Sequence, residues 1–273
     1  MRIINAEKIK KAVAQLCYRA NLDLRRDVLA ALKKAQQSET NSRAKRILEA
    51  IINNAAIAKK ERIAICQDTG MPYVFVELGN GVCIRGDLIK AINSGVEAGY
   101  KEAYLRNSVV RNPLERKGSG YMPAVIHIDP VTGDKLKLTL FPKGFGSENK
   151  SQLKMFKPTV SISGIKKFIL EAVKNAGPDA CPPYVVGVGI GGTADYAMYL
   201  AKKALLRKIS GRASKIEGEL LREINKLNIG PMGLGGKTTC LGVNIETFAT
   251  HIAGLPVAVN ISCHALRSAA ITL

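Results

Sequence analysis

The sequence predicts an α/β fold in which a mixed sheet with flanking helices is preceded by an N-terminal helical segment. The first sixty residues carry apolar side chains at helical spacing. After them, short runs rich in β-branched residues alternate with glycines and with further helical stretches. The chain has 273 residues, of which 47% are hydrophobic, and is therefore large enough to bury a substantial core.

Residues 1–60 are expected to form a helical segment packed on the main domain. Ile9, Val13 and Leu16 fall on one helical face, and similar spacing recurs in residues 28–32 and 47–52. Residues 61–273 are expected to form a single α/β domain. The sequence contains no obvious linker, so we expect the whole chain to be one structural unit.

Eight apolar runs in residues 61–273 are predicted to form strands. They are IAIC (63–66), YVFVEL (73–78), VCIR (82–85), AVIHI (124–128), KLKLTLF (135–141), YVVGVGI (184–190), TTCLGVNIE (238–246) and LPVAVNIS (255–262). Helices are expected at about 87–105, 163–175, 194–209 and 214–227. The turn from Asp129 to Asp134 predicts an antiparallel hairpin between the fourth and fifth runs, and hence a mixed sheet.

The chain is strongly basic, with 41 Lys and Arg against 22 Asp and Glu and a formal net charge of +19. The basic residues are paired along predicted helices, as on a solvated helix face. Aromatic residues make up only 5% and Trp is absent, which disfavours a stacking nucleic-acid site. A basic nucleic-acid-binding protein is kept as the alternative from another class.

No apolar run approaches the roughly 18 residues that span a bilayer, and the first helical turns are charged. We therefore expect a cytoplasmic protein with no membrane attachment. Its six cysteines include no CxxC pair and are expected to stay reduced.

Two glycine-rich stretches satisfy nucleotide-binding patterns only in part. GVGIGG (187–192) precedes a predicted helix, but Glu217, 25 residues after Gly192, lies inside a further predicted helix and does not end a strand. GPMGLGGKTT (230–239) has Pro231 where a phosphate loop requires glycine. We expect these glycines to let the backbone approach another backbone or a ligand closely.

The cysteines divide by neighbourhood. Three lie within apolar runs and are expected to be small core residues, namely Cys17, Cys83 and Cys240. The others lie at the edges of predicted elements, beside polar or proline-rich loops, namely Cys66, Cys181 and Cys263. These edge thiols are either buried structural residues or three ligands that converge on a metal centre. The absence of close cysteine pairs argues against structural zinc.

Five blocks carry a resemblance to a known family: ICQDTG (65–70), PKGFGSENKS (142–151), ACPPYVVGVGIGGTAD (180–195), GLGGKTT (233–239) and HIAGLPVAVNISCHALR (251–267). Their order resembles the catalytic N-terminal region of class I iron–sulfur fumarases and of the related L-tartrate dehydratase α subunit. The resemblance runs from about residue 10 to the C-terminus. It implies a 4Fe-4S cluster held by Cys66, Cys181 and Cys263, with one iron open as a Lewis acid.

The resemblance also implies the roles of five other residues. Gln67 and Asp68 would line the substrate pocket, with Asp68 exchanging a proton at the substrate hydroxyl. His251 and Arg106 would contact substrate carboxylates, and the backbone at Gly146 would approach the substrate. The simpler alternatives are a turn-closing aspartate, a core or capping histidine, a solvated arginine and an ordinary loop glycine.

Two departures from the family pattern affect the expected activity. An NTGDNTP-like segment is replaced by residues 117–123, KGSGYMP. Single-chain members of the family continue into a second domain, whereas this sequence ends at Leu273. We therefore expect a separate beta subunit to complete the active site, in an α2β2 assembly or an α–α dimer. The expected reaction on a C4 dicarboxylate is the reversible hydration of fumarate to L-malate, with tartrate dehydration as the alternative. A cluster-binding sensor or scaffold is a third possibility.

Overall fold

The computed structural model describes residues 1–209 and 213–273, and the chain divides there into two compact units. Unit 1 comprises Met1–Arg25, Asn54–Gly144 and Arg267–Leu273, and unit 2 comprises Arg26–Asn53 and Phe145–Leu266. The predicted α/β class with mixed sheets is confirmed in both units. The boundary expected at residue 60 differs from this division, because the first sixty residues are shared between the two units.

Unit 1 contains two helices, a four-stranded sheet and two smaller two-stranded sheets. Its elements are β1 (Arg2–Asn5), α1 (Ala6–Leu22), β2 (Met71–Gly79), β3 (Val82–Arg85), α4 (Leu88–Glu102), β4 (Val109–Asn112), β5 (Lys117–Gly120), β6 (Val125–Val131), β7 (Leu136–Lys143) and β12 (Ala269–Thr272). Helix α3 (Ser42–Glu61) begins in unit 2 and ends in unit 1.

The main sheet of unit 1 has the strand order β12-β7-β2-β6, with α1 packed on α4 and on β7. The predicted hairpin of β6 with β7 is wrong, because β2 lies between them and pairs with both. Residues 73–76 of β2 are almost completely buried, as expected for a central strand. The mixed character of the sheet is confirmed, since β2 runs parallel to β6 and antiparallel to β7.

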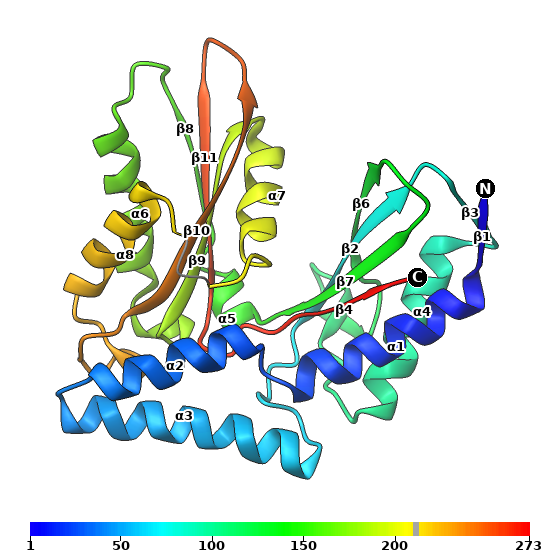
Figure 1. The fold of residues 1–273 in the computed structure, drawn as a ribbon, viewed down its shortest axis with the longest axis horizontal. Coiled ribbons are helices and arrows are strands. Elements are labelled where there is room, and N and C mark those ends of the chain that lie inside the picture. Colours follow the sequence, from blue (N-terminus) through cyan, green and yellow to red (C-terminus); the bar gives the residue numbers. More distant parts are fainter. Residues whose placement is uncertain (210–212) are drawn as a thin grey trace. The chain divides into compact units, whose positions relative to one another are not determined.

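Unit 2 is built on one four-stranded sheet with helices on both faces. Its elements are α2 (Arg26–Ser38), the first part of α3, α5 (Phe145–Glu148), β8 (Gln152–Phe156), α6 (Ile162–Ala176), the 3-10 helix η1 (Gly177–Ala180), β9 (Tyr184–Gly192), α7 (Ala194–Ala204), α8 (Lys215–Lys226), η2 (Pro231–Gly233), β10 (Cys240–Thr250) and β11 (Leu255–Ser262). The strand order is β10-β9-β11-β8, with β10 parallel to β9 and β11 antiparallel to it. Helix α7 covers one face, and α6 and α8 cover the other (Figure 1).

The glycines of GVGIGG allow close packing of strand on helix, as predicted. A Cβ atom added to Gly189 would lie 2.0 Å from the carbonyl oxygen of Ala197, and one added to Gly187 would lie 2.1 Å from that of Ala201. Both carbonyls belong to α7, so these two positions of β9 exclude any side chain. In the second motif, a Cβ on Gly230 would lie 1.9 Å from the Gly235 carbonyl oxygen. At these glycines the backbone therefore packs closely against another stretch of backbone.

No helix in the described ranges, 1–209 and 213–273, combines the length and the apolarity that crossing a membrane requires.

Candidate active site

The segment that carries Cys66, Gln67 and Asp68 follows α3 as an irregular loop. The strand predicted at residues 63–66 does not form. The backbone of Ile65 bonds to two helices instead: its N–H donates to the Asn21 carbonyl at 3.0 Å, and its carbonyl accepts from Asn54 Nδ2 at 2.9 Å. The side chain of Gln67 is exposed, whereas Cys66 and Asp68 are half-buried.

Two buried side chains hold the carbonyl groups of this loop. Arg267, only 2% exposed, donates from Nη2 to the Asp68 carbonyl oxygen at 2.7 Å. The hydroxyl of Tyr100, 1% exposed, lies 3.0 Å from the Thr69 carbonyl oxygen and 3.3 Å from that of Gly70. Burial raises the pKa of Tyr100 far above its usual value, so the hydroxyl remains protonated and able to donate.

Thr69 joins the loop to Arg106, another predicted site residue. The Arg106 backbone N–H donates to Thr69 Oγ1 at 3.1 Å, and Thr69 Oγ1 lies 3.4 Å from the Arg106 carbonyl oxygen. The side chain of Arg106 is exposed. Unit 1 by itself therefore brings Gln67, Asp68 and Arg106 together, although 37 residues separate Thr69 from Arg106.

The backbone at Gly144 approaches Asp68 closely. A Cβ atom on Gly144 would lie 3.0 Å from Asp68 Oδ2, so a larger residue there would displace the carboxylate. The other oxygen of this carboxylate, Oδ1, accepts from the Gly70 N–H at 3.0 Å. This last bond closes a turn, so the turn-closing role and a proton-transfer role of Asp68 are compatible.

In unit 2, the antiparallel pairing of β9 with β11 brings Cys181 and Cys263 to the same end of these two strands. Cys181 lies just before β9 and Cys263 just after β11, and the two strands are antiparallel with Ser262 opposite Val185. The backbone N–H of His264 donates to the Cys181 carbonyl at 3.2 Å, and His264 Nδ1 lies 3.0 Å from the same oxygen. Both thiols are half-buried.

Gly146 lies near this end of the strands, in the short helix α5. A Cβ on Gly146 would contact the carbonyl oxygen of Asp179 at 3.5 Å, two residues before Cys181. Asp179 also pairs with Lys150 at 2.8 Å between Oδ2 and Nζ. Unit 2 by itself therefore brings together Gly146, Cys181 and Cys263.

A buried polar network anchors α5 to the sheet and to α7. Glu148 forms an ion pair with Lys202 and accepts from Asn260 Nδ2 at 3.0 Å. Asn260 Nδ2 also donates to Ser151 Oγ at 2.7 Å. Burial lowers the pKa of Lys202, and the Glu148 carboxylate partly opposes this effect. The network fixes the chain just after Gly146, at Glu148 and Ser151.

His251 does not lie at the end of the sheet where Cys181 and Cys263 meet. It follows β10 and precedes β11, whereas Cys263 follows β11. Seven steps along β11 at about 3.3 Å each put about 23 Å between the two ends of the strand. His251 lines a shallow pocket of about 430 Å³ with Tyr196 and Phe248, whose ring centroids are 4.6 Å apart.

The other cysteines follow the predictions only in part. Cys17 and Cys240 are buried, and burial raises the pKa of Cys240 to about 12. Cys83 was predicted to be a core residue but is half-buried, because β3 pairs only with β1 in a small sheet. Among the described residues of either unit, no three His, Cys, Asp or Glu side chains are placed to hold a metal ion.

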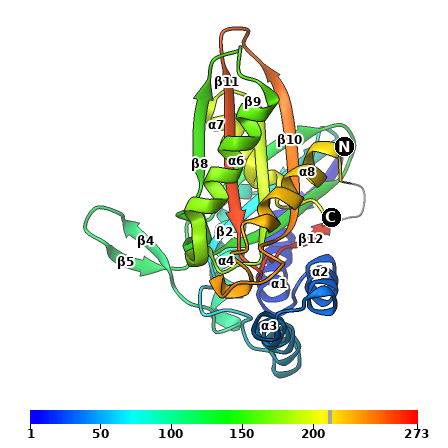
Figure 2. The same cartoon turned by 90° about the vertical axis from the view of Figure 1, so that its left-hand side faces the viewer.

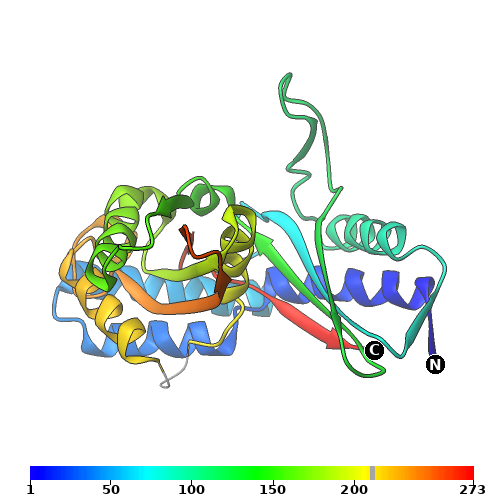
Figure 3. The same ribbon diagram turned by 90° about the horizontal axis from the view of Figure 1, so that it is seen from above.

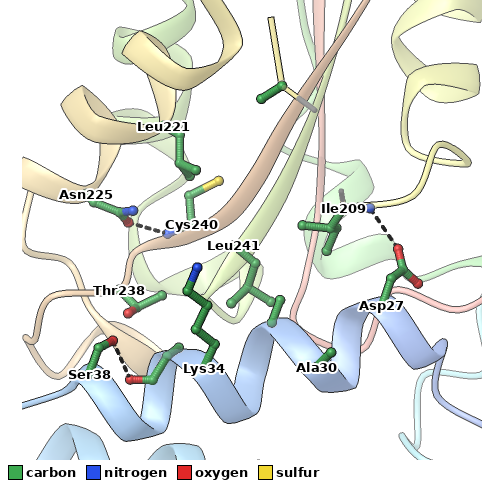
Figure 4. A pocket seen from close by; sticks show the side chains of 13 residues that line it. Asp27, Ala30, Lys34, Ser38, Ile209, Leu221, Asn225, Thr238, Cys240 and Leu241 are labelled. Atoms are coloured by element: carbon green, nitrogen blue, oxygen red, sulfur yellow. Dashed lines mark hydrogen bonds between the residues drawn. The ribbon is translucent and has the colours of Figure 1, made fainter. Parts of the chain in front are cut away.

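A pocket of about 560 Å³ lies between α2 and the start of β10 (Figure 4). Asp27 Oδ2 accepts from the Ile209 N–H at 2.8 Å, and Asn225 Oδ1 accepts from the Cys240 N–H at 2.8 Å. None of the predicted site residues lines this pocket. Its polar groups connect parts of the fold, and we assign it no catalytic role.

Comparison with known proteins identifies the family. The family model described as Fumarate hydratase (Fumerase) matches residues 10–272. The chain belongs to this fumarate hydratase family. The prediction of a hydro-lyase from the five sequence blocks is thereby confirmed.

The chain is also similar to relatives over most of their length. It is 45% identical over 275 residues to the "Putative L(+)-tartrate dehydratase subunit alpha" of Methanocaldococcus jannaschii, covering 96% of both chains. It is 32% identical over 270 residues to the L(+)-tartrate dehydratase subunit alpha of Escherichia coli (strain K12), covering 95% of this chain and 89% of the relative. The subunit of the same name from Shigella sonnei gives the same values.

Sequence reasoning about this hydro-lyase missed the buried polar residues that hold the loops. Tyr100 lies on the buried face of α4, where its position predicts only a core residue. Arg267 and Glu148 lie inside the recognised blocks HIAGLPVAVNISCHALR and PKGFGSENKS, which is the one signal that could have found them. Lys202 belongs to a lysine pair that was interpreted as a solvated face and is in fact buried.

We predict that Tyr100→Phe lowers the free energy of unfolding by about 1–2 kcal/mol, because the buried loop carbonyls lose a donor. Tyr104→Phe is the matched control, since Tyr104 is 96% exposed, and we expect a change below about 0.5 kcal/mol. Urea unfolding followed by circular dichroism measures both. Equal shifts in the two variants would contradict the assigned role of the Tyr100 hydroxyl.

Proposed function

We propose that this chain is the alpha subunit of a 4Fe-4S hydro-lyase that dehydrates tartrate. The choice of tartrate as substrate rests on the 45% identity, over 96% of both chains, to a relative named as a putative tartrate dehydratase alpha subunit. The family description favours a second candidate, the hydration of fumarate to L-malate expected from the sequence. Both reactions add or remove water at a C4 dicarboxylate.

Cys66, Cys181 and Cys263 are the proposed cluster ligands. Two of these thiols lie at the same end of β9 and β11 in unit 2, and all three are half-buried, as ligands of a cluster that meets substrate must be. The third proposed ligand, Cys66, belongs to the loop of unit 1 that also carries Gln67 and Asp68.

When bound, a cluster with three protein thiolates supplies one iron as a Lewis acid for a substrate hydroxyl. The residues of this chain then have the tasks of orienting the substrate and moving a proton. The exposed guanidinium of Arg106 clamps a carboxylate through its planar fork, with its backbone fixed by Thr69. Gln67 and the backbone at Gly146 orient the substrate, and Asp68 gives a proton to the departing hydroxyl group, which leaves as water.

The proposed role of His251 requires a second copy of the chain. Within unit 2, His251 and Cys263 lie at opposite ends of β11, about 23 Å apart. That separation is several times the length of a C4 dicarboxylate. His251 would therefore contact a substrate carboxylate in the site of another copy, which agrees with the expected dimer of alpha chains.

A beta subunit is the proposed partner that completes the site. The relatives that match this chain over nearly its whole length are named as alpha subunits. We propose that the base acting on the substrate carbon comes from the beta subunit, in an α2β2 assembly.

Thiol protection tests the cluster ligands. We predict that anaerobic iron–sulfide reconstitution protects Cys66, Cys181 and Cys263 from iodoacetamide, while Cys83, which is also half-buried, is alkylated as before. Peptide mass spectrometry gives the labelling of each thiol, and the visible absorbance of the protein reports the cluster. Protection of Cys83 together with labelling of the other three would show that the ligand set is wrong.

Turnover by the complex tests the substrate. We predict that the alpha and beta subunits, co-purified anaerobically, dehydrate L(+)-tartrate with a kcat/KM at least tenfold above that for L-malate or fumarate, about 1.4 kcal/mol in transition-state binding. A preference for malate and fumarate would establish the second candidate. A cluster-loaded complex inert toward all three compounds would favour the sensor or scaffold interpretation.

Mixing variants tests the contribution of His251 from a second copy. Asp68→Asn and His251→Asn should each be nearly inactive alone. After subunit exchange with random pairing, about half of the dimers contain one copy of each variant. Each mixed dimer has one of its two sites intact, so about a quarter of wild-type activity should return. Absence of recovery in confirmed mixed dimers would refute the arrangement.

A further inference from the structure

A two-stranded arm projects from unit 1. Strands β4 and β5 pair antiparallel, with Val110 opposite Ser119 and Asn112 opposite Lys117, and form a sheet separate from β12-β7-β2-β6. Figures 2 and 3 show this arm extending away from the rest of unit 1. The second strand begins the segment 117–123 that departs from the family pattern.

The base of the arm is anchored and its outer part is exposed. Leu105 and Val109, at the base, are 4% and 6% exposed, so they belong to the interior of unit 1. Every residue from 111 to 119 is exposed, and Leu114 at the tip is 93% exposed. A two-stranded hairpin without a covering layer is only marginally stable in water. The arm therefore has the form of an element that another surface covers.

Local side-chain bonds shape the tip of the arm. Asn112 Oδ1 accepts from the N–H groups of Leu114 and Glu115 at 3.2 and 3.1 Å, which forms an Asx turn. Lys117 and Glu115 form an ion pair across the end of the hairpin at 3.5 Å. An apolar side chain presented by a preorganised turn loses less conformational entropy on binding than one on a flexible loop.

Charge indicates what kind of surface receives the arm. Residues 109–120 carry three cations, Arg111, Arg116 and Lys117, against the single carboxylate of Glu115. This excess of positive charge is complementary to an acidic surface, whereas a second copy of this chain carries a net charge of +19. The complementary partner is a different, acidic protein surface with an apolar pocket for Leu114.

We propose that the β4–β5 arm docks on the beta subunit, with Leu114 as the apolar anchor and Arg111 and Arg116 facing acidic side chains. The identity of the partner rests on the proposed function, in which a beta subunit completes the site. The arm leaves unit 1 directly after the loop that contains Arg106. Docking would thus position the beta subunit beside the proposed substrate-binding arginine.

Photo-crosslinking in the assembled complex tests the arm. Leu114 is replaced by p-benzoylphenylalanine, and Ile89, a 45% exposed residue of α4 in the same unit, carries the probe in the matched control. We expect a covalent product with the beta subunit from position 114 and none from position 89. A product with a second alpha chain or with unit 2 of the same chain would overturn the proposal, as would the absence of any product.

Binding measurements provide the second test. We expect Leu114→Asp and the double variant Arg111→Glu/Arg116→Glu each to weaken the affinity for the beta subunit at least tenfold, with unchanged circular dichroism of the alpha chain. Unchanged affinity in both variants would refute the proposal. Failure of the substrate assignment would be distinguishable from failure of this proposal. A complex that crosslinks at position 114 but does not turn over tartrate would support docking of the arm and contradict only the substrate.

Discussion

The antiparallel pairing of β9 with β11 is the constraint on which the functional interpretation depends. It brings the segment that leads into β9 next to the residue that follows β11, and so places Cys181 near Cys263 although 82 positions of sequence separate them. The same pairing sends His251 to the opposite end of β11. One sheet therefore decides that Cys181 and Cys263 lie together and that His251 lies at the other end of the same strand.

In each unit, buried hydrogen bonds fix the segments that carry the predicted site residues. In unit 1, the carbonyls of residues 68–70 are held by buried side chains from α4 and from the segment before β12. In unit 2, the loop around Gly146 is fixed by the Glu148 network, and the turn after β11 bonds to the Cys181 carbonyl. Loops that must present reactive groups to a ligand cannot rely on a packed core, so buried hydrogen bonds maintain their shape.

The buried charges explain why a composition-based interpretation of the basic residues is incomplete. Lysine pairs along helices are typical of solvated faces, and Lys167, the second lysine of one such pair, is indeed solvated. Lys202 has the same local pattern but lies 7% exposed beside Glu148. Spacing along a helix indicates which residues share a face, but only the packing of α7 on the sheet decides which face is buried.

The sequence by itself determined the α/β class, most of the strands and helices, the family, and three thiols at the edges of elements. Those features depend on local periodicity and on ordered motifs, which are present in the linear chain. Tertiary structure alone decided that β2 lies between β6 and β7, that residues 63–66 bond to helices, and that Tyr100 and Arg267 hold the loop of Asp68. Strand order and buried hydrogen bonds are set by contacts between residues far apart in the chain, so they cannot be predicted from short-range sequence patterns.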